Sequence, residues 1–306
     1  MRQLVETIKK LRAAGYPPIF IYMYDETWHF IDRMFEAVQP VLGHNVVLEP
    51  SIYAWALQNR RNDSDAYIGE AFSLPHRDYE FGESWENGRI TLLTIWMPFT
   101  DATLENGCMF MLPREFDEYF DTPQHGNHMR SARPGAPIDD ARRKRRRDED
   151  DADGAAKIRH SPFEDHELRL KFDIGAARAL PGAAGTFFSW AGNTVHWGSH
   201  SMRRAPEPRM SMALVFKRAH MRRTHLQEEL PPLSRAQMRV ACMDMSLRLR
   251  LIAKGISLFR WWWGGALPER MLNPVLLADL RTAFTLAYNA TGGDIMRHVL
   301  PEGVRE

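Results

Sequence analysis

Residues 89–99 read RITLLTIWMPF, the strongest strand signal in the chain. The stretch is nearly continuous in apolar and β-branched residues and is bounded by turn signals, which is typical of a buried strand. A tight-turn signal, Glu105-Asn-Gly, follows it, and then comes a short apolar run at 108–112 that ends at a proline. We therefore expect a central strand at 89–99 and a short strand at 108–112.

Weaker strand and helix signals lie on both sides of this centre. Runs of β-branched and aromatic residues, or clear alternation, predict further strands at 18–25, 45–48, 52–58, 185–190, 194–199 and 209–216. Apolar periodicity predicts helices at 3–13, 27–42, 234–254 and 276–289. Short strands with Gly and Pro turns, flanked by helices, favour a mainly β (α+β) fold. Its core would be a double-stranded β-helix, or jelly roll, with N- and C-terminal helical flanks.

The domain organisation follows from shifts in composition. We expect the jelly-roll domain to cover residues 1–219 and a helical extension, 220–306, to pack on the same domain. An insertion rich in Pro, Gly, Asp and Arg spans about 117–167, and its segment 142–154 is a basic block followed by an acidic one. One interpretation is a nuclear-import or phosphate-binding patch. We favour a solvated, disordered insertion whose two halves neutralise each other.

Composition argues against several classes of protein. The 40 Lys and Arg residues are balanced by 39 Asp and Glu residues, so a net charge of +1 gives no general electrostatic case for binding nucleic acid. Two cysteines argue against a disulfide framework and fit a reducing compartment. Residues 1–16 lack the apolar core of a signal peptide, and the most apolar segment, 249–267, is interrupted by basic residues. We expect a soluble cytoplasmic protein with no membrane span.

The first functional candidates are His76 and Asp78, just upstream of the central strand. Side chains two residues apart on an extended segment point to the same side, which suits two adjacent metal ligands. A third ligand could be His196 or His200. We favour His196, because it follows an apolar strand and a glycine-containing turn, whereas His200 lies where the chain becomes polar. Two histidines and one carboxylate can hold Fe(II) and leave its other coordination positions open.

A candidate anchor for an acidic co-substrate is Arg209, which begins the last predicted strand and shares a face with Ser211. A guanidinium meets a carboxylate in a bidentate fork, so Arg209 could clamp the distal carboxylate of a 2-oxo acid while Ser211 adds a hydrogen bond. Arg203 and Arg204 lie closer to the histidine, but in a polar turn where solvated side chains are the better interpretation. For Trp96, in the central strand, core packing and a wall of the co-substrate pocket both stay open.

Three blocks of this sequence resemble the phytanoyl-CoA dioxygenase family. They are His76-Arg-Asp78, then Ile95-Trp-Met-Pro-Phe-Thr-Asp101 running to Glu105-Asn-Gly-Cys-Met-Phe-Met-Leu-Pro113, and then Leu180-Pro-Gly182 running through Thr194-Val-His196 to Pro208-Arg209. Several features depart from the family pattern, among them two in the spacing of the site residues. The insertion stretches the interval between Asp78 and His196, and Arg209 stands thirteen residues after His196 rather than about eleven.

The resemblance implies a non-haem dioxygenase that uses Fe(2+), O2 and 2-oxoglutarate as co-substrate. It implies iron ligands at His76, Asp78 and His196. It also implies hydroxylation or another oxidation of an unactivated C–H bond in a small organic or biosynthetic-intermediate substrate, with succinate and CO2 as co-products. The iron centre would carry the chemistry, and we predict no separate protein acid or base.

Two other functions compete with this prediction. Halogenating relatives resemble the fold but carry a small residue where Asp78 stands, so the carboxylate disfavours a halogenase. A non-catalytic or regulatory barrel protein would not need an intact set of metal ligands and arginine. The expected partner is a small-molecule substrate, not nucleic acid or a membrane. The apolar C-terminal segment also leaves a homodimer open.

Overall fold

The computed structural model describes residues 1–57, 75–121, 172–202, 204–221, 230–239, 241 and 243–258. The N-terminal part contains α1 (Arg2–Ala13), the 3-10 helix η1 (Pro18–Met23) and α2 (Asp25–Leu42). The two predicted N-terminal helices are thus confirmed. The predicted insertion lies mostly outside the described residues, as do the predicted helix at 276–289 and most of the extension from 220 onward.

The strand predicted at 18–25 is wrong, because this segment forms η1. A proline stands at its first position, and four consecutive side chains, Ile19 to Tyr22, are buried, so the segment has no strand-like alternation of buried and exposed residues. Two side chains of the next helix donate hydrogen bonds to backbone carbonyls of η1. Thr27 Oγ1 donates to the Ile21 carbonyl at 2.7 Å, and Trp28 Nε1 donates to the Tyr22 carbonyl at 2.7 Å. Tertiary packing therefore overrides the β propensity of the run.

The larger of two facing sheets has six antiparallel strands. They are β1 (Val46–Leu48), β2 (Tyr53–Leu57), β5 (Leu92–Pro98), β8 (Phe188–Ala191), β10 (Arg209–Arg218) and β11 (Leu233–Ser234). The strand order is β11-β1-β10-β5-β8, and β2 also pairs with β10. The long strand β10 therefore lies in the middle, between β5 on one side and β1 and β2 on the other.

The smaller sheet has the strand order β7-β6-β9 and is also antiparallel. It is made of β6 (Met109–Met111), β7 (Arg178–Leu180) and β9 (His196–Gly198). Short elements complete the described part: α4 (Phe81–Ser84), the hairpin of β3 (Trp85–Glu86) and β4 (Arg89–Ile90), and the 3-10 helices η2 (Arg114–Phe116) and η4 (Ile174–Ala176). Two antiparallel sheets with helical flanks agree with the predicted jelly roll.

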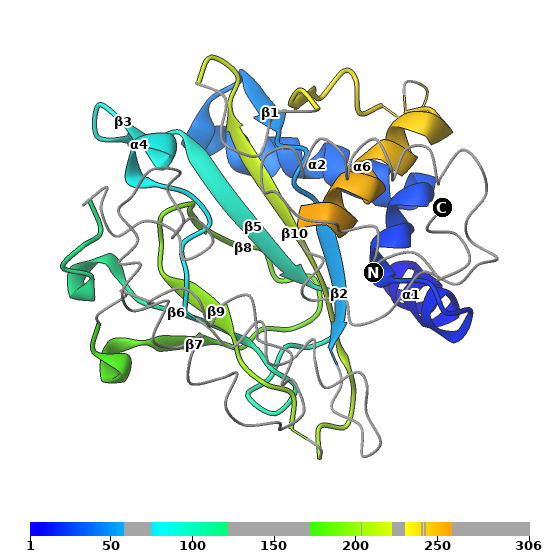
Figure 1. The fold of residues 1–306 in the computed structure, drawn as a ribbon, viewed down its shortest axis with the longest axis horizontal. Coiled ribbons are helices and arrows are strands. Elements are labelled where there is room, and N and C mark those ends of the chain that lie inside the picture. Colours follow the sequence, from blue (N-terminus) through cyan, green and yellow to red (C-terminus); the bar gives the residue numbers. More distant parts are fainter. Residues whose placement is uncertain are drawn as a thin grey trace, which may run out of the picture.

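The two faces of the larger sheet have different partners. On β10, Met210, Met212, Leu214 and Phe216 are buried on one face, and Phe216 meets Phe35 of α2 with ring centroids 4.9 Å apart. Figure 1 shows α1, α2 and α6 gathered away from the smaller sheet. The opposite face points toward the smaller sheet. According to the strand register, the residues on this face include Trp55, Thr94, Trp96, Phe188, Trp190, Arg209, Ser211 and Ala213.

The last described helix, α6 (Met245–Leu258), packs on η1 and β2. A Cβ on Gly255 would lie 2.6 Å from the Ile52 carbonyl oxygen, so the helix approaches this backbone as closely as glycine allows. The helix was predicted to begin at 234, but Ser234 ends β11. A turn follows, in which the Ser234 backbone N–H donates to Gln237 Oε1 at 2.9 Å. Among the described residues, no helix has the length and apolar character to cross a membrane.

Candidate metal and co-substrate site

The structure brings together His76, Asp78 and His196, the three predicted metal ligands. Asp78 lies between the two imidazoles, with Oδ1 3.4 Å from His76 Nε2 and Oδ2 3.5 Å from His196 Nε2. The two ring centroids are 4.4 Å apart, and one ligand atom from each residue lies within 4.8 Å of the others. His200 is exposed beyond the end of β9 and is not part of this group.

Backbone pairing sets this geometry. His76 and His196 form an antiparallel bridge in which each backbone N–H donates to the other residue's carbonyl, at 3.0 and 2.9 Å. Asp78 returns to the side of His76 because the intervening residue takes the opposite side of the extended segment. Thr94 Oγ1, from β5, donates to Asp78 Oδ2 at 3.0 Å. His196 Nδ1 lies 3.0 Å from the Thr194 carbonyl oxygen, an arrangement that holds a proton on Nδ1 and leaves Nε2 as the ligand atom.

The electrostatics of the group suit a divalent cation. Burial alone would raise the pKa of Asp78, but the neighbouring His196 and His76 and the hydrogen bonds from His76 and Thr94 outweigh it, so the pKa lies well below its ordinary range. Burial lowers the pKa of His196 to about 4, against the attraction of Asp78. At neutral pH the carboxylate is therefore ionised and His196 is neutral, which are the forms that coordinate metal ions. Two imidazole nitrogens and one carboxylate match the ligand preference of non-haem Fe(II).

Arg209 is a buried cation without a carboxylate beside it in the described part of the chain. Its residue is 1% exposed, Nη1 donates to the Gly107 carbonyl, and Nη1 lies 4.0 Å from Met109 Sδ. Nε has no hydrogen-bond partner among the described residues. Burial lowers the pKa of Arg209 to about 10, so the side chain is still charged at neutral pH. A buried charge with an open donor fits an anionic ligand such as a carboxylate.

The turn at Gly107 allows this contact. Gly107 has a φ of +95°, which favours glycine, and a Cβ there would lie 2.5 Å from the Ser199 carbonyl oxygen. The Asn-Gly turn noted in the sequence therefore brings a backbone carbonyl to Arg209. Arg204, the rival candidate, is an exposed residue that pairs with Glu105 at 3.2 Å, and Arg203 lies outside the described residues.

The other predicted co-substrate residues lie on the same face as Arg209. Ser211 is fully buried, and its Oγ has no hydrogen-bond partner among the described residues. The Trp96 ring lies 5.4 Å from the Arg209 guanidinium carbon and 5.6 Å from the Phe188 ring. Trp96 therefore both packs in the core and covers Arg209, so the two interpretations of this residue are compatible.

Sequence reasoning missed two residues that contact the metal-ligand group. Thr94 donates to Asp78, and the Trp190 ring lies 4.8 Å from the His196 ring. Trp190 is buried, and its Nε1 has no hydrogen-bond partner among the described residues. The signal that links them is the register of β5 with β8, which sets Thr94 opposite Trp190 and cannot be read from either strand alone.

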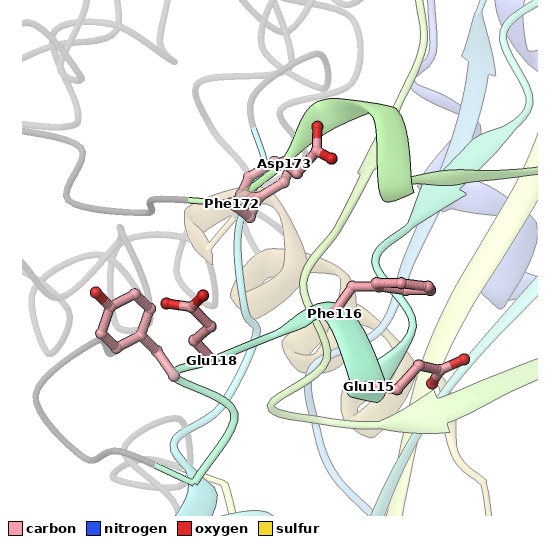
Figure 2. A pocket seen from close by; sticks show the side chains of 6 residues that line it. Glu115, Phe116, Glu118, Phe172 and Asp173 are labelled. Carbon is pink, nitrogen blue, oxygen red and sulfur yellow. The ribbon is translucent and has the colours of Figure 1, made fainter.

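A hollow of about 550 Å³ lies elsewhere, between η2 and η4, and Figure 2 shows its side chains. It is lined by Glu115, Phe116, Glu118, Tyr119, Phe172 and Asp173. No predicted site residue lines it, and its carboxylates belong to exposed residues. The hollow is therefore not the predicted metal and co-substrate site.

When the sequence is compared with models of known protein families, one family matches. A model of the phytanoyl-CoA dioxygenase family matches residues 29–205, more than half of the chain. A comparison with curated proteins gives no significant match.

Several solved structures are similar at low TM-scores. SnoN, a non-haem α-ketoglutarate-dependent epimerase from nogalamycin biosynthesis, has a TM-score of 0.36 and 19% identity over 65% of this chain and 60% of that chain. ThoJ, a non-haem monooxygenase, has a TM-score of 0.40 and 14% identity over 84% and 70%. EctD from S. alaskensis, with bound Fe, has a TM-score of 0.31 and 14% identity over 63% and 52%. The chain spans only 60% of the length of SnoN.

Proposed function

The chain belongs to the phytanoyl-CoA dioxygenase family, and from this premise we propose that it is an Fe(II)- and 2-oxoglutarate-dependent oxygenase of a small organic molecule. The observation that carries the proposal is the grouping of His76, Asp78 and His196 within 4.8 Å of one another. They lie by the sheet face that holds the buried cation Arg209, because Thr94 and Trp190 on this face contact Asp78 and His196. The proposal assigns the first three residues to iron and Arg209, with Ser211, to the distal carboxylate of 2-oxoglutarate.

The chain's own residues bind and orient in this proposal. Iron and 2-oxoglutarate, when bound, supply the oxidation of a C–H bond by O2, with succinate and CO2 as co-products. His76 and His196 would offer imidazole nitrogens to the iron and Asp78 a carboxylate, and three protein ligands would leave room for the co-substrate beside them. Thr94 holds the carboxylate by its hydrogen bond of 3.0 Å, and the Thr194 carbonyl holds the His196 ring.

Arg209 and its neighbours account for co-substrate selection. A dicarboxylate would give the buried guanidinium the anion that it lacks in the described residues, and Ser211 Oγ would add a neutral hydrogen bond. Trp96 and Trp190 are buried aromatic side chains on the same face and would exclude water from the reacting atoms. The reaction that the proposal favours is hydroxylation of an unactivated C–H bond in a small organic or biosynthetic-intermediate substrate.

The alternatives receive less support from the site. A halogenase needs a coordination position for halide, and Asp78 fills that position with a carboxylate that is ionised at neutral pH. A non-catalytic barrel protein has no need for neutral His196 beside ionised Asp78, nor for a buried arginine that has no carboxylate partner among the described residues.

The experiment compares the two histidines that the sequence left as rivals. We expect the wild-type protein to bind one Fe(II) per chain without oxygen, and to form succinate from 2-oxoglutarate when iron and O2 are present. His196→Ala should lose both properties, whereas His200→Ala, which changes an exposed residue, should keep most of them. Loss in His200→Ala with retention in His196→Ala would overturn the proposal.

A further inference from the structure

Arg77, the residue between the two ligands His76 and Asp78, is buried to 2% exposure. Because side chains alternate along an extended segment, it points to the side opposite its two neighbours. Its guanidinium donates from Nη2 to Asp117 Oδ1 at 2.8 Å, and Nη1 lies 2.8 Å from Asp117 Oδ2. The pair therefore has one hydrogen bond, through Nη2, and one close ion contact, through Nη1, between side chains that are each 3% exposed.

The same guanidinium reaches the turn that delivers His196. Arg77 Nη1 also donates to the backbone carbonyl of Asn193, a fully buried residue in the turn between β8 and β9. The Asn193 side chain is held on both sides: its Nδ2 donates to the Phe120 carbonyl at 2.8 Å, and its Oδ1 accepts from Trp85 Nε1 at 2.9 Å. Hydrogen bonds therefore fix the turn at Asn193, three residues before His196.

One side chain thus joins three segments that are far apart in the sequence. The first carries His76 and Asp78, the second carries His196, and the third is 114–121, which supplies Asp117 and the Phe120 carbonyl. A buried ion pair keeps a single geometry, because breaking it would leave an uncompensated charge in the interior. Any movement of Asp117 must therefore be accompanied by movement of Arg77, the direct neighbour of two metal ligands.

We propose that Arg77 is a positioning residue that couples the three metal ligands to one another and to segment 114–121 through Asp117 and Asn193. The metal part of this inference rests on the proposed function. Groups that orient metal ligands typically change metal affinity or activity by roughly 10- to 100-fold when they are replaced. Segment 114–121 also forms one wall of the hollow in Figure 2, so contacts made there are coupled mechanically to the metal ligands.

The test uses the full-length protein with Asp117→Asn, Arg77→Gln and the double variant. Asp117→Asn is the milder change, because it keeps the side-chain size and leaves an oxygen for the Tyr119 backbone N–H, which now donates to Asp117 Oδ1 at 3.2 Å. The matched control is Arg235→Gln. Arg235 also pairs with an aspartate, Asp32, at 2.8 and 2.9 Å, and it donates to Glu36 at 2.8 Å. Its side chain is 34% exposed, and no metal-ligand residue is involved.

The first readout is metal affinity, measured by titrating Fe(II) without oxygen and by the absorption spectrum of bound Co(II), which reports ligand geometry. We expect Asp117→Asn and Arg77→Gln each to weaken Fe(II) binding by roughly 10- to 100-fold and to alter the Co(II) spectrum. The double variant should be no weaker than Arg77→Gln, because both changes break one connection. Arg235→Gln should bind both metals as the wild type does.

The second readout needs no metal and separates this inference from the proposed function. Amide hydrogen exchange of the metal-free Asp117→Asn protein should rise together at 75–78, 114–121 and 192–196. Joint exchange in a protein that binds no iron would overturn the proposed function and leave the coupling standing. Normal iron binding, with faster exchange confined to 114–121, would overturn the coupling and leave the proposed function standing.

Discussion

Two buried cations on the same face of β10 differ in what surrounds them. Lys217 is 2% exposed and pairs with Glu49, which is fully buried, with Nζ 3.1 Å from Oε1. Arg209, toward the other end of the strand, is 1% exposed and has a carbonyl, a sulfur and an aromatic ring around it, but no carboxylate among the described residues. Lys217 therefore has its counter-ion within the fold, whereas Arg209 has none in the described part of the chain.

The difference separates a structural charge from one that awaits a ligand. An unpaired buried charge costs several kcal/mol, so a fold keeps one where another molecule neutralises it or where function demands it. Lys217 already has a buried carboxylate, Glu49, as its counter-ion. The surroundings of Arg209, with Ser211 Oγ also without a partner among the described residues, support a role in binding a carboxylate from outside.

Removing Lys217 should give the largest change in stability. Lys217→Met leaves Glu49 buried without its cation, and we expect the free energy of unfolding to fall by about 3–5 kcal/mol, measured by denaturant titration. The double variant Lys217→Met/Glu49→Leu should recover most of this loss. Co-substrate affinity should not change in the folded single variant. A large loss of 2-oxoglutarate affinity would break the contrast, since Lys217 would then belong to the ligand site.

Acid should destabilise the metal-free protein at the ligand group. His196 takes up a proton near pH 6.5 when unfolded but only near pH 4 when folded, so between these values the unfolded state binds more protons. Stability should therefore fall as pH drops through this window, by about 3 kcal/mol for a shift of this size. Thermal or denaturant melts of chelator-treated protein measure it, with His196→Gln as the comparison. An equal acid response in that variant would assign the loss to other groups.

Ser211→Ala tests whether the surroundings of Arg209, unlike those of Lys217, bind a ligand. One neutral hydrogen bond to a ligand contributes about 1 kcal/mol, so the affinity for 2-oxoglutarate should fall roughly fivefold. Stability should hold or rise, because the variant removes a buried hydroxyl that has no partner among the described residues. Calorimetric titration and a thermal melt give the two values. A marked drop in melting temperature would mean that the hydroxyl is bonded within the fold.

Deleting residues 142–154 should have the smallest effect. The segment has no apolar residue larger than alanine, so it cannot bury enough surface to offset the entropy of ordering it. We expect a melting temperature within a few degrees of wild type and unchanged formation of succinate without prime substrate. A large drop in melting temperature would show that the insertion packs on the barrel. Loss of prime-substrate turnover alone would make it part of the substrate site.

The grouping of His76, Asp78 and His196 could be predicted from sequence because its signals are local. His76 and Asp78 have a spacing of two, and His196 follows a strand and a turn, which is enough to direct both segments inward. Thr94, Trp190 and the Arg77–Asp117 pair depend on register and on contacts between distant segments, and no local pattern reveals them. The domain boundary at 219 and the homodimer stay predictions.

The two errors in the fold have a tertiary cause. Residues 18–25 have the composition of a strand, but the packing of α1, α2, α6 and β2 around them favours a buried 3-10 turn. Residues 234–244 have helical periodicity, yet the short strand β11 pairs with β1, and the helix begins only at Met245. Local propensity is a weak preference, and packing of neighbours decides both cases.

The central claim, that Arg209 binds the distal carboxylate of 2-oxoglutarate, is tested most directly by changing that carboxylate and the arginine together. Affinities of the Fe(II)-loaded protein for 2-oxoglutarate and for 2-oxopentanoate, which lacks the distal carboxylate, would be measured by calorimetry without oxygen. A buried charge-assisted contact is worth about 2–5 kcal/mol, so wild type should prefer 2-oxoglutarate by roughly 30- to several-thousand-fold. Arg209→Ala should lose this preference, and Arg204→Ala should keep it. Equal affinities in wild type, or a preference that survives in Arg209→Ala, would contradict the account.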